Sequence, residues 1–130
     1  MIPRPIINVV EFEYALERAG LEKSELEIIN YIRYMGTFTQ PLLVMALKLE
    51  SKPPALSKLC LSCRKIGLHI PNHFKEVREW SKTINEDGIR WDGNLICSIA
   101  QNIDGEKLIP ENNTSQFHCF AVHKELFIGF

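Results

Sequence analysis

Apolar residues recur at helical spacing through the first two thirds of the chain and alternate at strand spacing near its end. The first helix is predicted from the apolar positions Val9, Phe12, Leu16 and Ala19. Gly20 can terminate this helix, because glycine readily adopts the left-handed conformation that follows many helix ends. The glutamates of the same segment lie off the apolar stripe, so we expect an acidic outer face.

A second helix is predicted from a capping box, Ser24-Glu25-Leu26-Glu27. In this motif the Ser24 hydroxyl accepts a hydrogen bond from a free backbone N–H of the first turn, and Glu27 reaches back to the cap. The apolar positions of the helix are Leu26, Ile29 and Ile32. Gly36 is expected to end it.

Two further helices follow, separated by the breaker Pro53-Pro54. Thr37 or Thr39 can cap the first of them, with Pro41 in its first turn, where a missing N–H does no harm. Its predicted buried residues are Leu43, Ala46 and Leu47. The second is expected to carry one apolar stripe, Leu56, Leu59, Cys60, Cys63 and Ile66, and to end at Gly67.

A fifth helix is predicted from residue 71 to 87, with Phe74, Val77 and Ile84 inward and Trp80 nearby. The pattern then favours strands: residues 89–91 and 94–101 would form a hairpin around Asp92-Gly93, because Asp-Gly suits a tight turn. A second such turn is predicted at Asp104-Gly105 before residues 107–109, a polar loop at 111–115, an alternating strand at 116–123 and a short strand at 126–128.

Helices first and strands second predict the α+β class, with an N-terminal helix-turn-helix-like bundle followed by a C-terminal antiparallel β-meander. We expect residues 1–130 to form a single domain. A division, if the chain has one, would fall between a helical part, 9–70, and a part with a helix and strands, 71–130.

The segment from residue 25 to 70 resembles a winged helix-turn-helix core of the kind found in MarR-type regulators. The resemblance is carried by Leu26, Ile29 and Ile32, by Phe38-Thr39-Gln40, and by the stretches 54–59 and 64–68. The turn at 49–54 is longer than in a tight helix-turn-helix, and another helix precedes the expected wing. The resemblance implies that residues 54–66 are the recognition helix of a DNA-binding protein.

On this implication, nucleic acid would be contacted by the polar residues of that helix, which can donate to phosphates or base edges. They are Ser57, Lys58, Ser62, Arg64 and Lys65. Between Lys48 and Arg78 seven basic residues stand against two acidic ones, a net charge of +5, whereas the segment 11–27 carries −4. The competing interpretation of these residues is an ordinary solvated basic helix face.

Composition limits the alternatives. The chain has 130 residues, 45% of them hydrophobic and 24% charged, which is ordinary for a globular protein and excludes general disorder. The net charge of −1 means that any nucleic-acid binding depends on a local basic patch. No apolar run is long enough for a membrane span, and no signal peptide is visible, so we expect an intracellular protein, nuclear or cytoplasmic, with reduced cysteines and no membrane partner.

Cysteine and histidine residues form one motif with the spacing of metal ligands. The pattern C-x2-C-x5-H-x3-H could hold zinc through Cys60, Cys63, His69 and His73. The competing interpretation is that the two cysteines complete the apolar stripe of their helix as small buried residues, and we expect this core role and no cofactor. Cys119 and His123 could join His118 or Cys97 in another site, or act as a nucleophilic pair, but their alternation also suits a packed strand.

No recognised catalytic or nucleotide-binding motif occurs, so we expect the protein not to be an enzyme. The first hypothesis is therefore a non-enzymatic module that binds DNA or RNA, or associates with chromatin. The alternative is a protein-interaction or homodimerisation domain. For that alternative the interface is predicted at Phe127 and Phe130, near an unpaired C-terminal strand edge.

Overall fold

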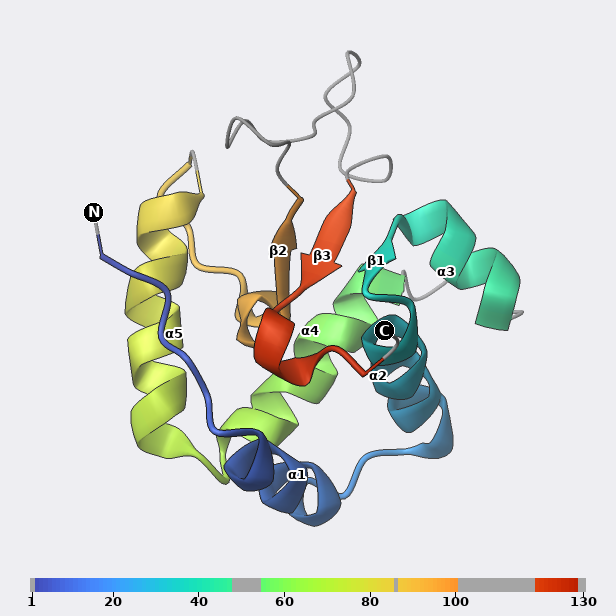
Figure 1. Ribbon diagram of the computed structural model, residues 1–130, viewed down its shortest axis with the longest axis horizontal. Helices are drawn as coiled ribbons and strands as arrows, with labels where there is room; N and C mark the ends of the chain where they lie inside the picture. The colour runs from blue at the N-terminus through green and yellow to red at the C-terminus, as the bar shows by residue number, and fades with distance from the viewer. Residues whose placement is uncertain (1, 48–54, 86, 101–118, 129–130) are drawn as a thin grey trace.

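Helices pack around a small antiparallel sheet in the computed structural model, which describes residues 2–47, 55–85, 87–100 and 119–128 (Figure 1). The helices of these ranges are α1 (Val9–Arg18), α2 (Lys23–Met35), α3 (Gln40–Leu47), α4 (Ala55–Gly67) and α5 (Pro71–Ile84). The strands are β1 (Thr37–Phe38), β2 (Cys97–Ile99) and β3 (Phe120–Val122), and two 3₁₀ turns are η1 (Asp92–Leu95) and η3 (Lys124–Leu126). The α+β class predicted from the sequence is confirmed. None of the described helices has the length and apolarity that a bilayer crossing requires.

Local capping explains where the first two helices begin. The side chain of Asn8 accepts hydrogen bonds from the backbone N–H of Val10 and Glu11 at the start of α1. At the start of α2 the Glu25 carboxylate accepts one from the backbone N–H of Glu22 at 2.9 Å. The predicted capping box at Ser24 and Glu27 is therefore wrong, because the helix begins earlier and the carboxylate that reaches back is Glu25.

Gly36 ends α2, as predicted, and its backbone explains why glycine stands there. Its φ of 78° is left-handed, a conformation that other residues adopt at a cost. A Cβ at this position would also lie 2.4 Å from the ring of Phe127, which packs directly over it. Glycine is therefore required at position 36 for two reasons, the left-handed turn and the close approach of the Phe127 ring.

The third helix is capped by Thr39, whose Oγ1 accepts a hydrogen bond from the backbone N–H of Leu42. Of the three residues predicted to be buried in α3, Leu43 is buried, Leu47 is partly buried, and Ala46 is exposed. In α2 the predicted inward residue Leu26 is likewise exposed.

The strands form a sheet in the order β1-β3-β2, with β3 antiparallel to both neighbours. Phe120 of β3 lies opposite Phe38 of β1 and opposite Ile99 of β2. The rings of Phe38 and Phe120 stack with their centroids 5.3 Å apart. This order does not confirm the predicted meander, because the strand between α2 and α3 provides one edge of the sheet.

Two predicted strand features are wrong. Residues 89–91 form no strand, and Asp92-Gly93 begins the 3₁₀ turn η1 instead of a hairpin, because buried contacts hold Asp92 in place. Residues 124–126 form η3, where a strand was predicted from 126 onward. The predicted turn at Asp104-Gly105, the strand 107–109, the polar loop 111–115 and the first three residues of the strand 116–123 lie outside the described residues. Within the described part of that last strand, Phe120–Val122 forms β3.

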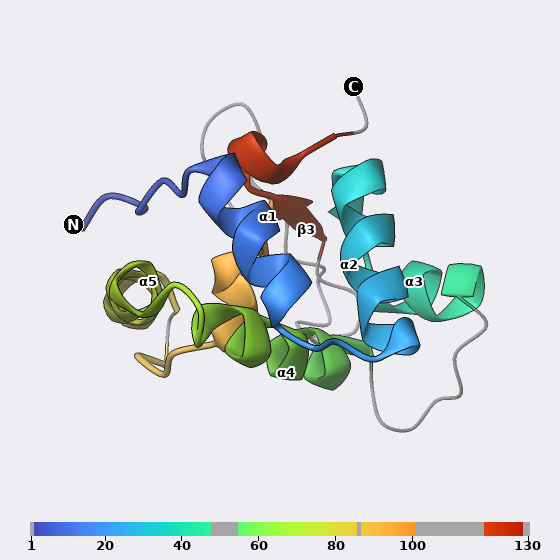
Figure 2. The same cartoon turned by 90° about the horizontal axis from the view of Figure 1, so that it is seen from below.

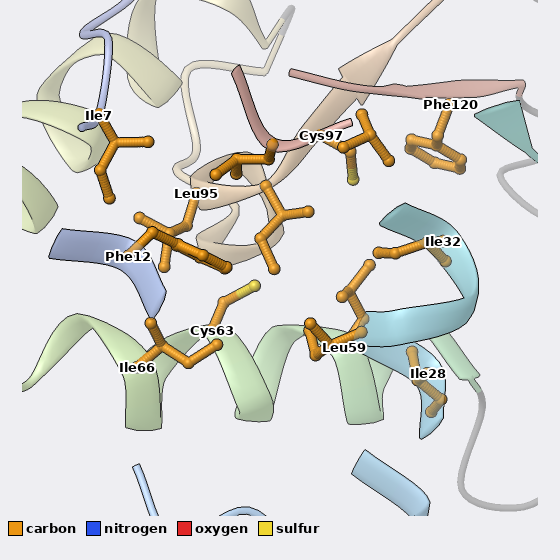
Figure 3. Close-up of a cluster of buried hydrophobic side chains, with 14 of the residues drawn as sticks. Ile7, Phe12, Ile28, Ile32, Leu59, Cys63, Ile66, Leu95, Cys97 and Phe120 are labelled. Carbon is orange, nitrogen blue, oxygen red and sulfur yellow. The ribbon is translucent and has the colours of Figure 1, made fainter. Parts of the chain in front are cut away.

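The core lies between α4 and the elements around it. In Figure 3, Cys63 and Ile66 project from α4 toward Phe12 of α1 and Leu95 of η1, and Leu59 of the same helix lies nearer to α2. All five side chains are almost completely buried, and each large one contributes about 1.5–3 kcal/mol to stability by leaving water. Because this inward face of α4 is committed to the core, the polar side chains of α4 other than Ser62 are directed sideways or outward.

Two arginines attach the first and last described segments of the chain to the helices through ion pairs and hydrogen bonds. The guanidinium of Arg4 binds the Glu125 carboxylate through two hydrogen bonds, at 2.5 and 2.9 Å. Arg33 of α2 is 4% exposed, donates from Nε to the carbonyl of Leu126 and pairs with Glu13. These contacts link the N-terminal segment, α1 and α2 to η3 and the residues beside it.

Candidate functional site

The outward face of α4 is the candidate site. Figure 2 shows α4 along one side of the molecule, with α1, β3 and η3 all on its other side. An open hollow of about 300 Å³ lies on this face. Its lining residues are Ser57, Lys58, Cys60, Leu61 and Arg64. The spacing of these residues places them on one side of the helix, opposite the core residues.

The structure separates the five residues predicted to contact nucleic acid. Ser57 and Arg64 are exposed, and Lys58 is partly exposed and donates to the Ser24 hydroxyl at 3.2 Å. Ser62 is completely buried, and its hydroxyl donates to the carbonyl of Lys58 at 2.8 Å. The prediction for Ser62 is therefore wrong, because a side chain inside the core cannot reach a partner.

Lys65 forms an ion pair with Glu25, to which the Ser62 hydroxyl also donates a hydrogen bond. We call these three residues the Glu25 cluster. Glu25 of α2 is only 3% exposed and accepts a hydrogen bond from Lys65 Nζ at 2.7 Å. Burial raises the pKa of Glu25, but hydrogen bonds from Lys65 and from the Glu22 backbone outweigh this, so the pKa lies below its ordinary value. The cluster thus joins α2 to α4 with one amine neutralising one carboxylate.

A second carboxylate lies on the opposite side of α4. Asp92, at the start of η1, is 3% exposed, and three arginines reach it: Arg64 of α4, Arg78 of α5 and Arg90. Arg64 Nε donates to Oδ2 at 2.7 Å, Arg78 Nε donates to Oδ1 at 3.2 Å, and Arg90 Nε lies 3.8 Å from Oδ1. We call these four residues the Asp92 cluster.

The Asp92 carboxylate remains ionised in this setting. Burial raises its pKa, but the hydrogen bonds from Arg64 and Arg78 outweigh that effect and hold the pKa below its ordinary value. Arg78 is held from a second direction, because its guanidinium lies 4.2 Å from the ring centroid of Phe74. Phe74 packs in turn against Gly67, where a Cβ would lie 2.4 Å from its ring.

The four residues of the zinc motif are not brought together. Cys63 is completely buried, Cys60 and His73 are half-buried, and His69 is exposed. Among the described residues, no three His, Cys, Asp or Glu side chains are grouped closely enough to hold a metal ion. Burial raises the pKa of Cys63 well above its usual range, because the thiolate would lose its hydration.

Cys97 and His123 are buried separately. Nε2 of His123 donates to the carbonyl of Asn94 at 2.7 Å, and the ring meets Trp80 edge-on with centroids 5.7 Å apart. Cys97 Sγ instead contacts the carbonyl of Gly93. In the described part of the chain no cysteine lies within hydrogen-bond distance of a histidine, so the predicted nucleophilic pair is not assembled there.

The predicted interface residue Phe127 is half-buried and packs over Gly36 against the core. Its ring therefore serves the packing of η3 on α2. Phe130, the other residue predicted for the interface, lies outside the described residues.

Sequence reasoning missed the Asp92 cluster. Asp92 was interpreted as a turn former beside Gly93, and its partners are separated from it by as many as 28 residues. The only local signal was the number of arginines between residues 64 and 90. No protein-family model, curated protein or solved structure matches this chain.

Proposed function

We propose that the protein is a non-enzymatic module that binds nucleic acid through α4 on a winged-helix-like core. The order of elements supports the proposal: α2, β1, α3, α4, then β2 and β3, with β3 between the other strands. This is the order in which a winged helix presents three helices and a wing. The chain departs from it by placing α5 and η1 between α4 and β2.

The observation that carries the proposal is the outward face of α4, which no labelled element covers in Figure 2. Lys58 and Arg64 line the hollow on this face, and Ser57 adds a hydroxyl. Such side chains donate to phosphate oxygens or base edges. The face is locally basic although the whole chain carries a net charge of −1. A module of this kind acts in the nucleus or cytoplasm.

Two of the four thiols are unsuited to nucleophilic catalysis. Burial raises the pKa of both Cys63 and Cys97, so these thiols stay protonated near neutral pH. A protonated, enclosed thiol is a poor nucleophile.

The test is a titration of labelled duplex and single-stranded DNA and RNA with the full chain at about 50 and 200 mM salt. Phosphate contacts release counterions, so the association constant should fall steeply with salt. The variant Lys58→Gln should weaken binding, whereas Lys124→Gln, which changes the same charge on η3, should not. Absence of binding to every probe at the lower salt concentration would refute the proposal.

A protein-interaction role is the second candidate, and a specific observation favours it. Apart from Gln40, all residues of α3 are apolar, yet Leu43 is the one residue of this helix that is fully buried. Leu42 and Met45 are 56% and 74% exposed. Apolar side chains that gather on one exposed face, as these two do on α3, are typical of surfaces that partners cover.

The double variant Leu42→Glu/Met45→Glu tests this candidate. If the face is covered by a second copy, sedimentation of the wild type should show a dimer that the variant loses. The control is Val10→Glu, which alters an exposed apolar residue of α1. A wild type that remains monomeric at high concentration would exclude homodimerisation through α3.

A further inference from the structure

We infer that the Asp92 cluster is a phosphate-binding site, at which Asp92 holds three arginines in position to bind the phosphate groups of a nucleic-acid backbone. The identification of nucleic acid as the source of the phosphate rests on the proposed function. The chemistry of the site itself follows from the geometry of the four side chains.

The first argument is charge balance. One carboxylate is surrounded by three guanidinium groups, which leaves two positive charges in excess in a small volume. The arginine side chains are 53%, 33% and 48% exposed, so they remain accessible while Asp92 beneath them is buried. Like charges held together in this way attract an anion, since an anion relieves their mutual repulsion.

The second argument is the direction of the hydrogen bonds. Arg64 and Arg78 donate to Asp92 from Nε, and Nε is also the nearest nitrogen of Arg90. Among the described residues, the hydrogen bonds of these arginines to Asp92 come from Nε, and none comes from an Nη atom. Each guanidinium therefore retains terminal N–H donors, which suit the oxygens of phosphate and can bind them in pairs.

The third argument is rigidity. The arginines come from three segments, α4, α5 and the residues before η1, and all meet at the same buried carboxylate. Arg78 is further fixed by its stacking on Phe74. Arginines ordered before the ligand arrives lose less side-chain entropy when they bind it. A solvated surface arginine lacks this advantage.

The site also adjoins the proposed interface. Arg64 belongs both to the Asp92 cluster and to the lining of the hollow on α4, together with Lys58 and Ser57. A backbone phosphate bound by the cluster would place the neighbouring nucleotides over α4. In this arrangement the Asp92 cluster anchors the backbone, and α4 contacts the groups beside it.

The experiment uses two probes on the full chain, inorganic tripolyphosphate by calorimetry and a labelled DNA duplex by titration at two salt concentrations. The principal variant is Arg64→Gln/Arg90→Gln, and its matched control is Arg18→Gln/Lys124→Gln, which removes two exposed charges elsewhere. Arg90→Gln alone guards against misfolding, because Arg90 is the most distant partner of Asp92 and both hydrogen bonds to the carboxylate remain.

Tripolyphosphate affinity should fall about tenfold or more in Arg64→Gln/Arg90→Gln, because charge-assisted hydrogen bonds are lost, and about threefold in Arg90→Gln. The control should stay within about twofold of the wild type, as expected for screened surface charges. For the duplex, the slope of log affinity against log salt should decrease by about 0.9 for each phosphate contact removed.

The outcomes separate the two proposals. Tripolyphosphate binding that depends on the arginines, without binding of any of the duplex and single-stranded DNA and RNA probes, would support the site but refute nucleic acid as its source and with it the proposed function. Duplex binding that is equal in the principal variant and the control would overturn the phosphate site and leave the proposed function standing. Failure of tripolyphosphate and of every nucleic-acid probe to bind the wild type would overturn both.

Discussion

On the side of α4 that faces α2, one buried carboxylate meets one amine, whereas on the side that faces η1 one buried carboxylate meets three guanidinium groups. Glu25 and Asp92 are equally buried, and the pKa of each is lowered by the basic side chains around it despite the opposing effect of burial. The two clusters differ in net charge: the Glu25 cluster is neutral, and the Asp92 cluster retains positive charge. Similar buried ion pairs on one helix can therefore serve packing on one side and ligand binding on the other.

The largest expected effect comes from breaking the neutral cluster. Glu25→Ala should lower the free energy of unfolding by about 3 kcal/mol, because the substitution removes the buried partner of Lys65 and of the Glu22 backbone. Urea denaturation measures the loss. The control is Glu27→Ala, an exposed residue of the same helix, for which a change within about 0.5 kcal/mol is expected. Tripolyphosphate binding should be unchanged, and a loss of it would mean that the two clusters are not separate.

Acid should destabilise the protein before either carboxylate titrates. Burial lowers the pKa of His123 to about 4, so the folded state keeps it neutral while the unfolded chain binds a proton below about pH 6.5. Stability should therefore fall by about 3 kcal/mol between pH 7 and 4, and the lowered pKa of His73 acts in the same direction. The contributions of Glu25 and Asp92 persist through this range and disappear at lower pH, as their depressed pKa values require.

Denaturation at several pH values checks this expectation, with His123→Gln as the variant and His69→Gln as the exposed control. The pH dependence above 4 should become shallower in the first and stay unchanged in the second. An equally steep profile in both would assign the effect to other groups.

Neutralising Asp92 should cost less than removing Glu25. Asp92→Asn keeps the shape of the side chain, and its three arginine partners are exposed enough to remain hydrated, so a loss of about 1–2 kcal/mol is expected. Asp87→Asn is the matched control, because asparagine can still accept the hydrogen bond from the Ile89 backbone. A loss equal to that of Glu25→Ala would show that the Asp92 cluster is mainly a stabilising network.

The smallest expected effects are those of replacing two lysines of α4, Lys65 and Lys58, one at a time. Lys65→Gln should lower the free energy of unfolding by about 1 kcal/mol, because the buried Glu25 carboxylate keeps its hydrogen bonds from the Glu22 backbone and the Ser62 hydroxyl. It should leave duplex binding within about twofold, whereas Lys58→Gln, on the lined face of α4, should weaken binding more, as one lost phosphate contact would. The reverse order of the two lysines would contradict the assignment of Lys65 to the Glu25 cluster.

Local patterns predicted the helices well because their causes are local. Gly36 ends α2 as expected, and the inward residues Phe12, Leu59 and Cys63 were identified from spacing alone. The two-residue strand β1 was missed, since so short a segment has no periodicity and is defined by its pairing with residues more than 80 positions away.

The candidate site was predicted only in part, and for a related reason. Arg64 and Lys58 were correctly placed on an accessible side of α4. Ser62 was assigned to that side by its polarity, yet one turn of helix gives its hydroxyl an internal acceptor at the Lys58 carbonyl. Asp92 carried the local signature of a turn, and its burial depends on arginines that the fold brings from α4 and α5.

The central position of β3 has a consequence for how the molecule assembles. Among the described strands, β1 and β2 each pair with β3, which lies between them and follows both in the sequence. Closing the loop between Phe38 and Phe120 carries a large entropic cost, which local helix formation avoids. The helical part should therefore condense first, and the sheet should close in one late step when β3 inserts, so that partially synthesised chains would leave Phe38 without its stacking partner.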